Sequence, residues 1–222
     1  MIERMMKSFP LVAFLAAFAL AVPVPVLSDE QPTYRGPMNA SEKAFASAIA
    51  ADLMARFPTA ADAEKAGYVR YTSEDDTGAI SYADMHWQSP DLRHPGQLWY
   101  DKNGRLLGAD FSVLVSGTPD RPRLWGVNPG RWWEFNGHVH WVSKSAVTSA
   151  IVYDGWAWDK NFAAAGGDPE HPNASTLVAM KKVPDAGDVV TIFHFPAIWD
   201  LIVWVAPNPN GAFAWKNPSV KP

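Results

Sequence analysis

The dipeptide Asn103-Gly104 constrains the fold more than any other short stretch of the chain. Asn-Gly favours a tight two-residue turn, and here it lies between Tyr100 and an alternating run. The strand after the turn is expected to present one apolar face, formed by Leu107, Ala109, Phe111, Val113 and Val115. Asp110 and Ser112 then point from the other face toward water or a cavity. The segment therefore predicts an antiparallel sheet with one buried face.

A helix is predicted before this sheet. Asn39 is its expected N-cap, Glu42 completes a capping box, and Pro58 ends the helix. The apolar residues recur every four positions and form one stripe, made of Phe45, Ile49, Leu53 and Phe57. A short second helix is expected to start at Thr59 and to end at Gly67.

Runs rich in aromatic and β-branched residues, separated by turn residues, indicate further strands. The expected strands are 68–72, 80–87, 97–101, 105–115, 138–142, 147–153, 189–195 and 201–205. Between them, 162–173 is expected to be a loop and 175–182 a helix. The predicted fold class is α+β, with short N-terminal helices packed on a mainly antiparallel β-sheet, either open or curled into a barrel. One domain is expected to span residues 39–222.

The N-terminal residues 1–28 have the pattern of a secretory signal peptide. Arg4 and Lys7 precede an uncharged apolar run from Phe9 to Val22, which is too short to cross a membrane as a mature helix. Residues 29–38 are polar and are interpreted as a linker. The sequence therefore predicts a periplasmic or secreted protein that keeps no integral membrane segment after signal cleavage.

Charge and cysteine content exclude several classes of function. After signal cleavage, 17 Lys plus Arg remain against 22 Asp plus Glu, a net charge of about −5. This balance argues against nucleic acid or an anionic membrane as the partner. The absence of cysteine excludes disulfides, thiolate metal sites and thiol nucleophiles. No glycine-rich phosphate loop or nucleophile elbow occurs, so no organic cofactor is predicted.

His138 and His140 are the leading candidates for chemistry, because two histidines one residue apart on a strand share a face. A Cu²⁺ or Zn²⁺ site needs three or four ligands, and His86 and His194 are the expected further ligands. The alternative is that backbone and carboxylate groups satisfy these imidazoles. The usual cupin pattern requires a Glu four residues beyond the pair, where this chain has Lys144.

The eleven tryptophans support a second hypothesis, a non-catalytic module that holds a small ligand in an aromatic-lined cavity. The structural alternative is a core built from large aromatic side chains. Trp132 and Trp133 are adjacent, so they point to opposite sides of a strand and one is expected at the surface. The acidic turn 74–78 is interpreted as solvated.

A third hypothesis is a hydrolase or oxidoreductase that depends on the same histidines. In that case His138 or His140 is expected to work with Asp84 or Asp110 as an acid and base pair. The sequence leaves open whether the protein is an enzyme.

Two stretches resemble a family of uncharacterised exported bacterial proteins. The first runs from Ala83-Asp84-Met85-His86-Trp87 through Pro95-Gly96-Gln97-Leu98-Trp99-Tyr100-Asp101 to Asn103-Gly104-Arg105. The second joins Val203-Trp204-Val205 to a closing run, Asn208-Pro209-Asn210-Gly211-Ala212-Phe213. The resemblance implies an exported, single-domain protein and matches His86 to the family's histidine, but it carries no activity. Ile202 stands where relatives have histidine.

Overall fold

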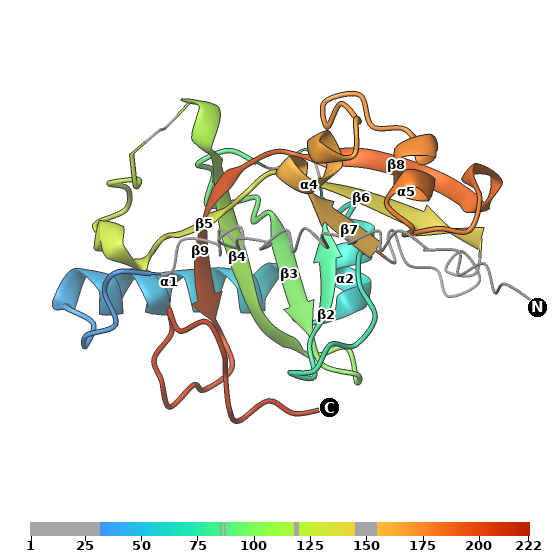
Figure 1. Cartoon of the computed structure of the whole chain (residues 1–222). Coiled ribbons are helices and arrows are strands. Elements are labelled where there is room, and N and C mark those ends of the chain that lie inside the picture. Colours follow the sequence, from blue (N-terminus) through green and yellow to red (C-terminus); the bar gives the residue numbers. More distant parts are fainter. Residues whose placement is uncertain (1–31, 85, 87, 118–119, 145–154) are drawn as a thin grey trace, which may run out of the picture.

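The computed structural model describes residues 32–222 except 85, 87, 118–119 and 145–154 (Figure 1). The predicted signal peptide, residues 1–28, and the predicted strand 147–153 lie outside the described residues. Within the described part, no helix combines the length and apolar character that crossing a membrane requires. The fold is α+β, as predicted, and its strands form two antiparallel sheets of six and three strands.

Two helices open the described chain, where the sequence predicts them. Helix α1, Ala40–Arg56, begins at a capping box in which Asn39 accepts from the Glu42 amide and Glu42 accepts from the Asn39 amide. Helix α2, Ala60–Lys65, is capped by Thr59. Gly67 follows with φ +100°, a left-handed conformation that glycine adopts without steric cost. The starts of α1 and α2 thus follow from side-chain caps, and the end of α2 follows from the conformational freedom of glycine.

The six-stranded sheet has the order β1-β2-β3-β4-β9-β5. Its strands are β1 Val69–Arg70, β2 Ile80–Ala83, β3 Gln97–Tyr100, β4 Leu106–Leu114, β5 Trp133–Phe135 and β9 Ile198–Trp204. Helix α1 runs across one face of this sheet (Figure 1). The apolar stripe of α1 packs there on a core that includes Leu98, Phe111 and Leu201. The opposite face of the sheet carries a separate, smaller apolar cluster that includes Leu107, Ile202 and Trp204.

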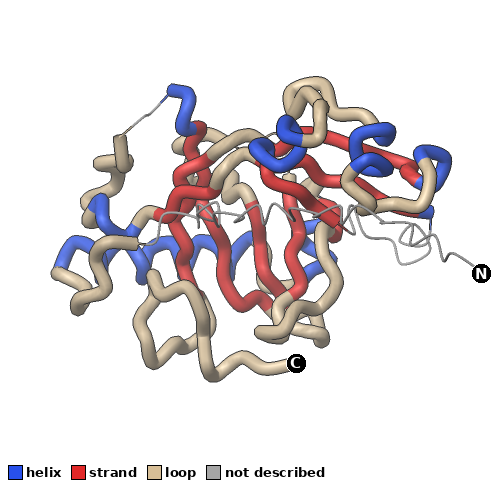
Figure 2. Tube along the Cα trace, in the orientation of Figure 1, coloured by secondary structure: helices blue, strands red, loops and turns tan. Residues whose placement is uncertain are grey.

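The three-stranded sheet has the order β7-β6-β8 and lies at one end of the larger sheet (Figure 2). Its strands are β6 His138–Ser143, β7 Gly155–Trp158 and β8 Val189–Phe195. Two short helices, α4 Asp159–Ala164 and α5 Ala174–Ala179, supply Phe162 and Leu177 to a second core. Val139 and Trp141 enter this core from β6, as the sequence predicts. The face that carries His138 and His140 therefore points away from it.

One bent pair of strands joins the two sheets. Strand β5 continues into β6 after residues 136–137, and β8 continues into β9 after residues 196–197. The pairing register is unbroken across the bend, since Phe135 faces Ile198 and His138 faces Phe195. The small sheet is thus the continuation of the β5/β9 pair, turned away from the large sheet.

Three sequence predictions need correction. Leu107 leaves the expected face of β4 and packs with Trp133 and Ile202, because a register shift opposite Trp99 and Tyr100 interrupts the alternation. Helix α4 extends to Ala164, so residues 162–164 are helical where the sequence predicts the start of a loop. Trp132 and Trp133 are both buried, because each face of the strand is covered by a different cluster.

A buried ion pair ties α1 to the turn before β5. Glu42 is fully buried, and Arg131 Nε donates to its Oε1 at 3.0 Å. Arg131 also donates to the Gly36 carbonyl at 2.8 Å. Burial alone would raise the pKa of Glu42, but hydrogen bonds from Arg131 and from two backbone amides outweigh it and lower that pKa. The capping glutamate therefore also positions the 3-10 turn Pro129–Arg131.

Replacing Arg131 by Met is expected to lower the free energy of unfolding by about 3 kcal/mol, because Glu42 is left buried without its partner. Adding Glu42→Gln to Arg131→Met is expected to recover about 1 kcal/mol, since the uncompensated charge is removed. Chemical denaturation measures both. Lys65→Met, which breaks an exposed pair with Asp62, is the control and should cost less than about 0.5 kcal/mol. Equal losses for Arg131→Met and Lys65→Met would contradict the assignment.

Candidate functional site

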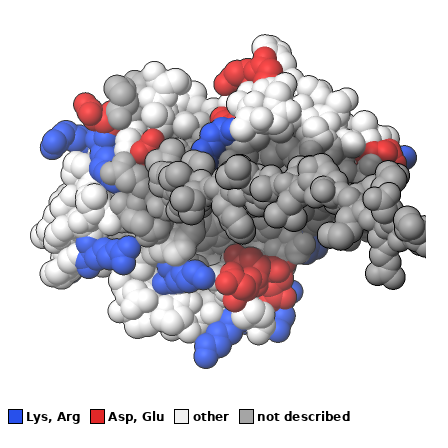
Figure 3. Space-filling view, in the orientation of Figure 1, with Lys and Arg blue, Asp and Glu red and all other residues white. Residues whose placement is uncertain are grey.

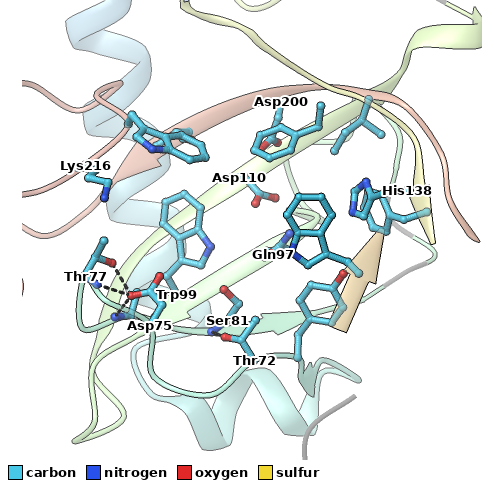
Figure 4. Close-up of a pocket in the computed structure, with 18 of the residues that line it drawn as sticks. Thr72, Asp75, Thr77, Ser81, Gln97, Trp99, Asp110, His138, Asp200 and Lys216 are labelled. Atoms are coloured by element: carbon cyan, nitrogen blue, oxygen red, sulfur yellow. Dashed lines mark hydrogen bonds between the residues drawn. The ribbon is translucent and has the colours of Figure 1, made fainter. Parts of the chain in front are cut away.

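A cavity of about 500 Å³ lies where the free face of the large sheet meets the histidine face of the small sheet (Figure 4). Both sheets, the turn after β1 and the C-terminal segment contribute to its wall. Its aromatic lining comprises Tyr71, Trp99, Phe135, Trp156, Trp158, Phe195, Trp204 and Trp215. Its ionisable lining comprises Asp75, Asp76, Asp110, Asp200, His138, His140 and Lys216, in addition to Tyr71.

The aromatic wall consists of neighbouring rings rather than isolated ones. Trp99 and Trp204 lie on the large sheet with ring centroids 5.4 Å apart. Trp156 and Trp158, on β7, are 4.5 Å apart and both approach the His138 ring within 6 Å. Since β7 and the large sheet are far apart in the sequence, the fold brings these rings to one cavity.

Two buried carboxyl groups form the floor of the cavity. Asp110 on β4 lies opposite Ile202, and Asp200 on β9 lies opposite Ser112, so the two carboxyls are diagonal neighbours on one face. They are only 2% and 4% exposed, respectively. Ser112 Oγ donates to Asp200 Oδ1 at 3.2 Å. The Oδ1 atom of Asp110 is buried and forms no hydrogen bond within the described structure.

Burial disfavours the ionised form of both groups. It raises the pKa of Asp110 to about 7, although a backbone hydrogen bond from Gln97 acts in the opposite direction. Burial and the nearby Asp110 charge raise the pKa of Asp200 well above its ordinary value, partly offset by Ser112. The interiors around both carboxyls thus favour their protonated forms, and the two groups titrate as a pair.

The histidine pair forms the side wall, as the sequence predicts. The His138 and His140 ring centroids are 4.5 Å apart. His138 Nδ1 lies 2.8 Å from the Asn136 carbonyl oxygen, so this nitrogen is the donor. His140 Nε2 lies 2.7 Å from the Tyr71 hydroxyl. Burial, followed by the neighbouring His138, lowers the pKa of His140 to about 3, so its imidazole is neutral at physiological pH.

The other two predicted ligands lie elsewhere. His194 faces Val139 in the β6/β8 register, which places it on the opposite side of the small sheet from the pair. Its Nε2 is 2.9 Å from Asp159 Oδ2 on α4. The His86 side chain is 91% exposed on a turn, 2.8 Å from Asp84. Among the described residues, no three His, Cys, Asp or Glu side chains are arranged to hold a metal ion.

The surface around the cavity mouth is of mixed charge. The acidic turn, interpreted from the sequence as solvated, contributes Asp75 and Asp76 to the rim. Lys216 Nζ lies 3.5 Å from Asp76 Oδ2 across the rim. In Figure 3 the acidic side chains of this face gather below the centre, with basic side chains beside them.

Sequence reasoning missed Asp200 entirely, whereas it predicted that Asp110 faces water or a cavity and named it as a partner for histidine. The available signal was a lone carboxyl within the apolar run Ile198–Trp204. A charged residue in a strand that is otherwise buried is unusual enough to mark a site. What the sequence does not show is that β4 and β9 are neighbours, since their pairing joins distant segments.

No protein-family model, curated protein or solved structure matches the chain. The resemblance to exported bacterial proteins thus stays a prediction, and the cavity must be interpreted from its own chemistry.

The raised pKa of Asp110 predicts a pH-dependent stability. The unfolded chain loses the Asp110 proton near pH 4, whereas the folded chain keeps it to about pH 7. The contribution of Asp110 to the free energy of unfolding is therefore largest below about pH 4 and is lost as the pH rises to about 7. Asp110→Asn should remove this loss and be more stable than the unmodified chain at pH 8, by on the order of 2 kcal/mol.

Chemical denaturation between about pH 4 and pH 8 measures the difference. Asp76→Asn is the matched control, because that carboxyl lines the same cavity but its side chain is 84% exposed. Parallel stability curves for the unmodified chain and Asp110→Asn would show that Asp110 ionises normally.

Proposed function

We propose that this protein binds a small organic molecule in the cavity between its two sheets. The observation that carries the proposal is the cavity itself, about 500 Å³ and lined by eight aromatic side chains from both sheets and the C-terminal segment. Cavities of this size with mainly apolar walls and a few polar groups are typical of small-molecule sites.

Exposure separates the tryptophans that build the core from those at the cavity. Trp132, Trp133 and Trp199 are almost completely buried, which agrees with a structural role. Trp156 and Trp215 line the cavity and remain 45% and 44% exposed. Leaving large apolar rings in contact with water is unfavourable, and a ligand that covers them regains that free energy.

Polar groups at fixed positions can orient the bound molecule. In Figure 4 the Ser81 and Thr72 side chains lie along the lower wall, Gln97 lies near the centre beside Asp110, and His138 lies at the right. His138 presents a ring nitrogen, while the carboxyl floor can accept or donate hydrogen bonds. The arrangement favours an amphipathic ligand over a purely apolar one.

Binding is tested with the neutral fluorescent probe N-phenyl-1-naphthylamine. We expect its fluorescence to rise on addition of the purified chain, because it enters an apolar cavity. Trp156→Ala and Trp215→Ala are each expected to weaken binding about fivefold or more, the loss of one aromatic contact. Val190→Ala, which shortens an exposed apolar side chain that does not line the cavity, is the control. An unchanged affinity in both tryptophan variants, or no binding, would contradict the proposal.

The copper or zinc site remains a prediction, favoured by the close approach of the His138 and His140 rings. Two imidazoles are fewer than the three or four ligands such a site requires, so small-molecule binding is preferred. Equilibrium dialysis against Cu²⁺ or Zn²⁺ tests it. If the pair binds metal, His138→Ala with His140→Ala lowers uptake by about one equivalent, and His86→Ala leaves it unchanged. Unchanged uptake in the double variant would end the hypothesis.

The expected location belongs to the proposal as well. Export to the periplasm or the medium follows from residues 1–28, and it would place the cavity in contact with molecules from outside the cell.

A further inference from the structure

We propose that the molecule bound in the cavity is a small organic cation, an ammonium ion seated against the Asp110 and Asp200 carboxyls and between the tryptophan rings. This inference rests on the proposed function and names the chemical class of its ligand.

The balance of charge in the cavity favours a cation. Four carboxyl groups line it, from Asp75, Asp76, Asp110 and Asp200. Among the described lining residues Lys216 is the one Lys or Arg, and its Nζ lies 3.5 Å from Asp76 Oδ2 at the rim. His140 adds no charge, because its pKa is lowered to about 3. A positively charged ligand thus meets attraction from the floor and the rim.

The floor also offers an unused acceptor. Asp110 Oδ1 is buried and, within the described structure, accepts no hydrogen bond. Neither Asp110 nor Asp200 forms an ion pair with any described residue. A buried carboxyl oxygen without a hydrogen bond is costly, so a ligand that brings a positive charge or an N–H donor to Asp110 Oδ1 relieves that cost.

Gly96 keeps this acceptor open. A Cβ atom at Gly96 would lie 3.1 Å from Asp110 Oδ1 and 2.8 Å from Ser112 Oγ. A side chain there would crowd the carboxyl pair and displace Ser112 from Asp200. Because residue 96 is a glycine, its backbone lies close to the carboxyl pair and no side chain occupies the space beside Asp110 Oδ1.

The walls suit the same ligand. Ammonium ions are attracted to the faces of aromatic rings, most strongly to tryptophan, and quaternary ammonium groups are recognised by cages of such rings. The Trp99 and Trp204 rings flank the floor, and Trp156, Trp158 and Trp215 complete the wall. A neutral ligand would gain the apolar contact but would leave the carboxyls without a counter-charge.

Binding a cation should expel a proton from the carboxyl pair, since the cation favours the ionised form. Affinity is therefore expected to rise as the pH increases through about 7, where the Asp110 carboxyl ionises. Tyr71, Asp75, Asp76, His138, His140 and Lys216 face the same cavity and set its potential. Proton release is measured by calorimetry in two buffers of different ionisation enthalpy.

The decisive experiment compares two probes of nearly identical shape, choline and its neutral carbon analogue 3,3-dimethylbutan-1-ol. Calorimetric titration of the purified chain at about pH 7.5 should show choline bound at least about tenfold more tightly, a difference of about 1.4 kcal/mol. Asp110→Asn should abolish this preference, whereas Asp168→Asn, which removes an exposed carboxyl that does not line the cavity, should retain it. Asp200→Asn provides a second variant, and circular dichroism checks that each variant is folded.

The outcomes separate this inference from the function on which it rests. Equal binding of the two probes, or tighter binding of the alcohol, would contradict the proposal that the ligand is a cation. The proposal that the cavity binds a small molecule would remain. The same holds if N-phenyl-1-naphthylamine binds but choline, tetramethylammonium and n-butylammonium do not bind at up to about 10 mM. A preference for choline that remains in both Asp110→Asn and Asp200→Asn would show that the ammonium ion does not bind against these two carboxyls. Failure of every probe, the naphthylamine included, overturns both proposals.

Discussion

The cavity depends on the bend in one pair of strands. Because β5 and β9 continue into β6 and β8 in the same register, the histidine face of the small sheet is held at a fixed position beside the carboxyl face of the large sheet. Only residues 136–137 and 196–197 separate the two sheets. Helix α1 occupies the other face of the large sheet, and α4 and α5 cover the other face of the small one. In each sheet, the face on which the helices do not pack is thus turned toward the cavity.

The polar groups of the cavity are tolerated because apolar cores lie behind them. Strand β9 is buried throughout: Leu201 and Val203 pack beneath α1, while Asp200 points from the opposite face. Strand β4 repeats the pattern, with Phe111 inward and Asp110 at the cavity. The alternation of a strand allows a stable core and a costly buried carboxyl within consecutive residues.

Much of the fold could be predicted from local chemistry, and the histidine pair could be as well. The capping box at Asn39, the turn at Gly104 and the shared face of His138 and His140 each depend on residues close in the sequence. The division into two sheets and the position of His194 could not, because both depend on which distant strands pair and in which register. One residue of register decides whether His194 faces the pair or α4. The carboxyl floor was missed for the same reason, since Asp110 and Asp200 become neighbours only through the β4/β9 pairing.

The two aspartates also bear on how this protein could change over time. Since Asp110 and Asp200 are buried away from water, replacing them with uncharged residues is expected to stabilise the fold rather than weaken it. Selection for thermal stability alone would then favour variants in which Asp110 and Asp200 are replaced. Such a variant is expected to keep the two-sheet architecture and to lose the carboxyl groups to which the proposed ligand would bind.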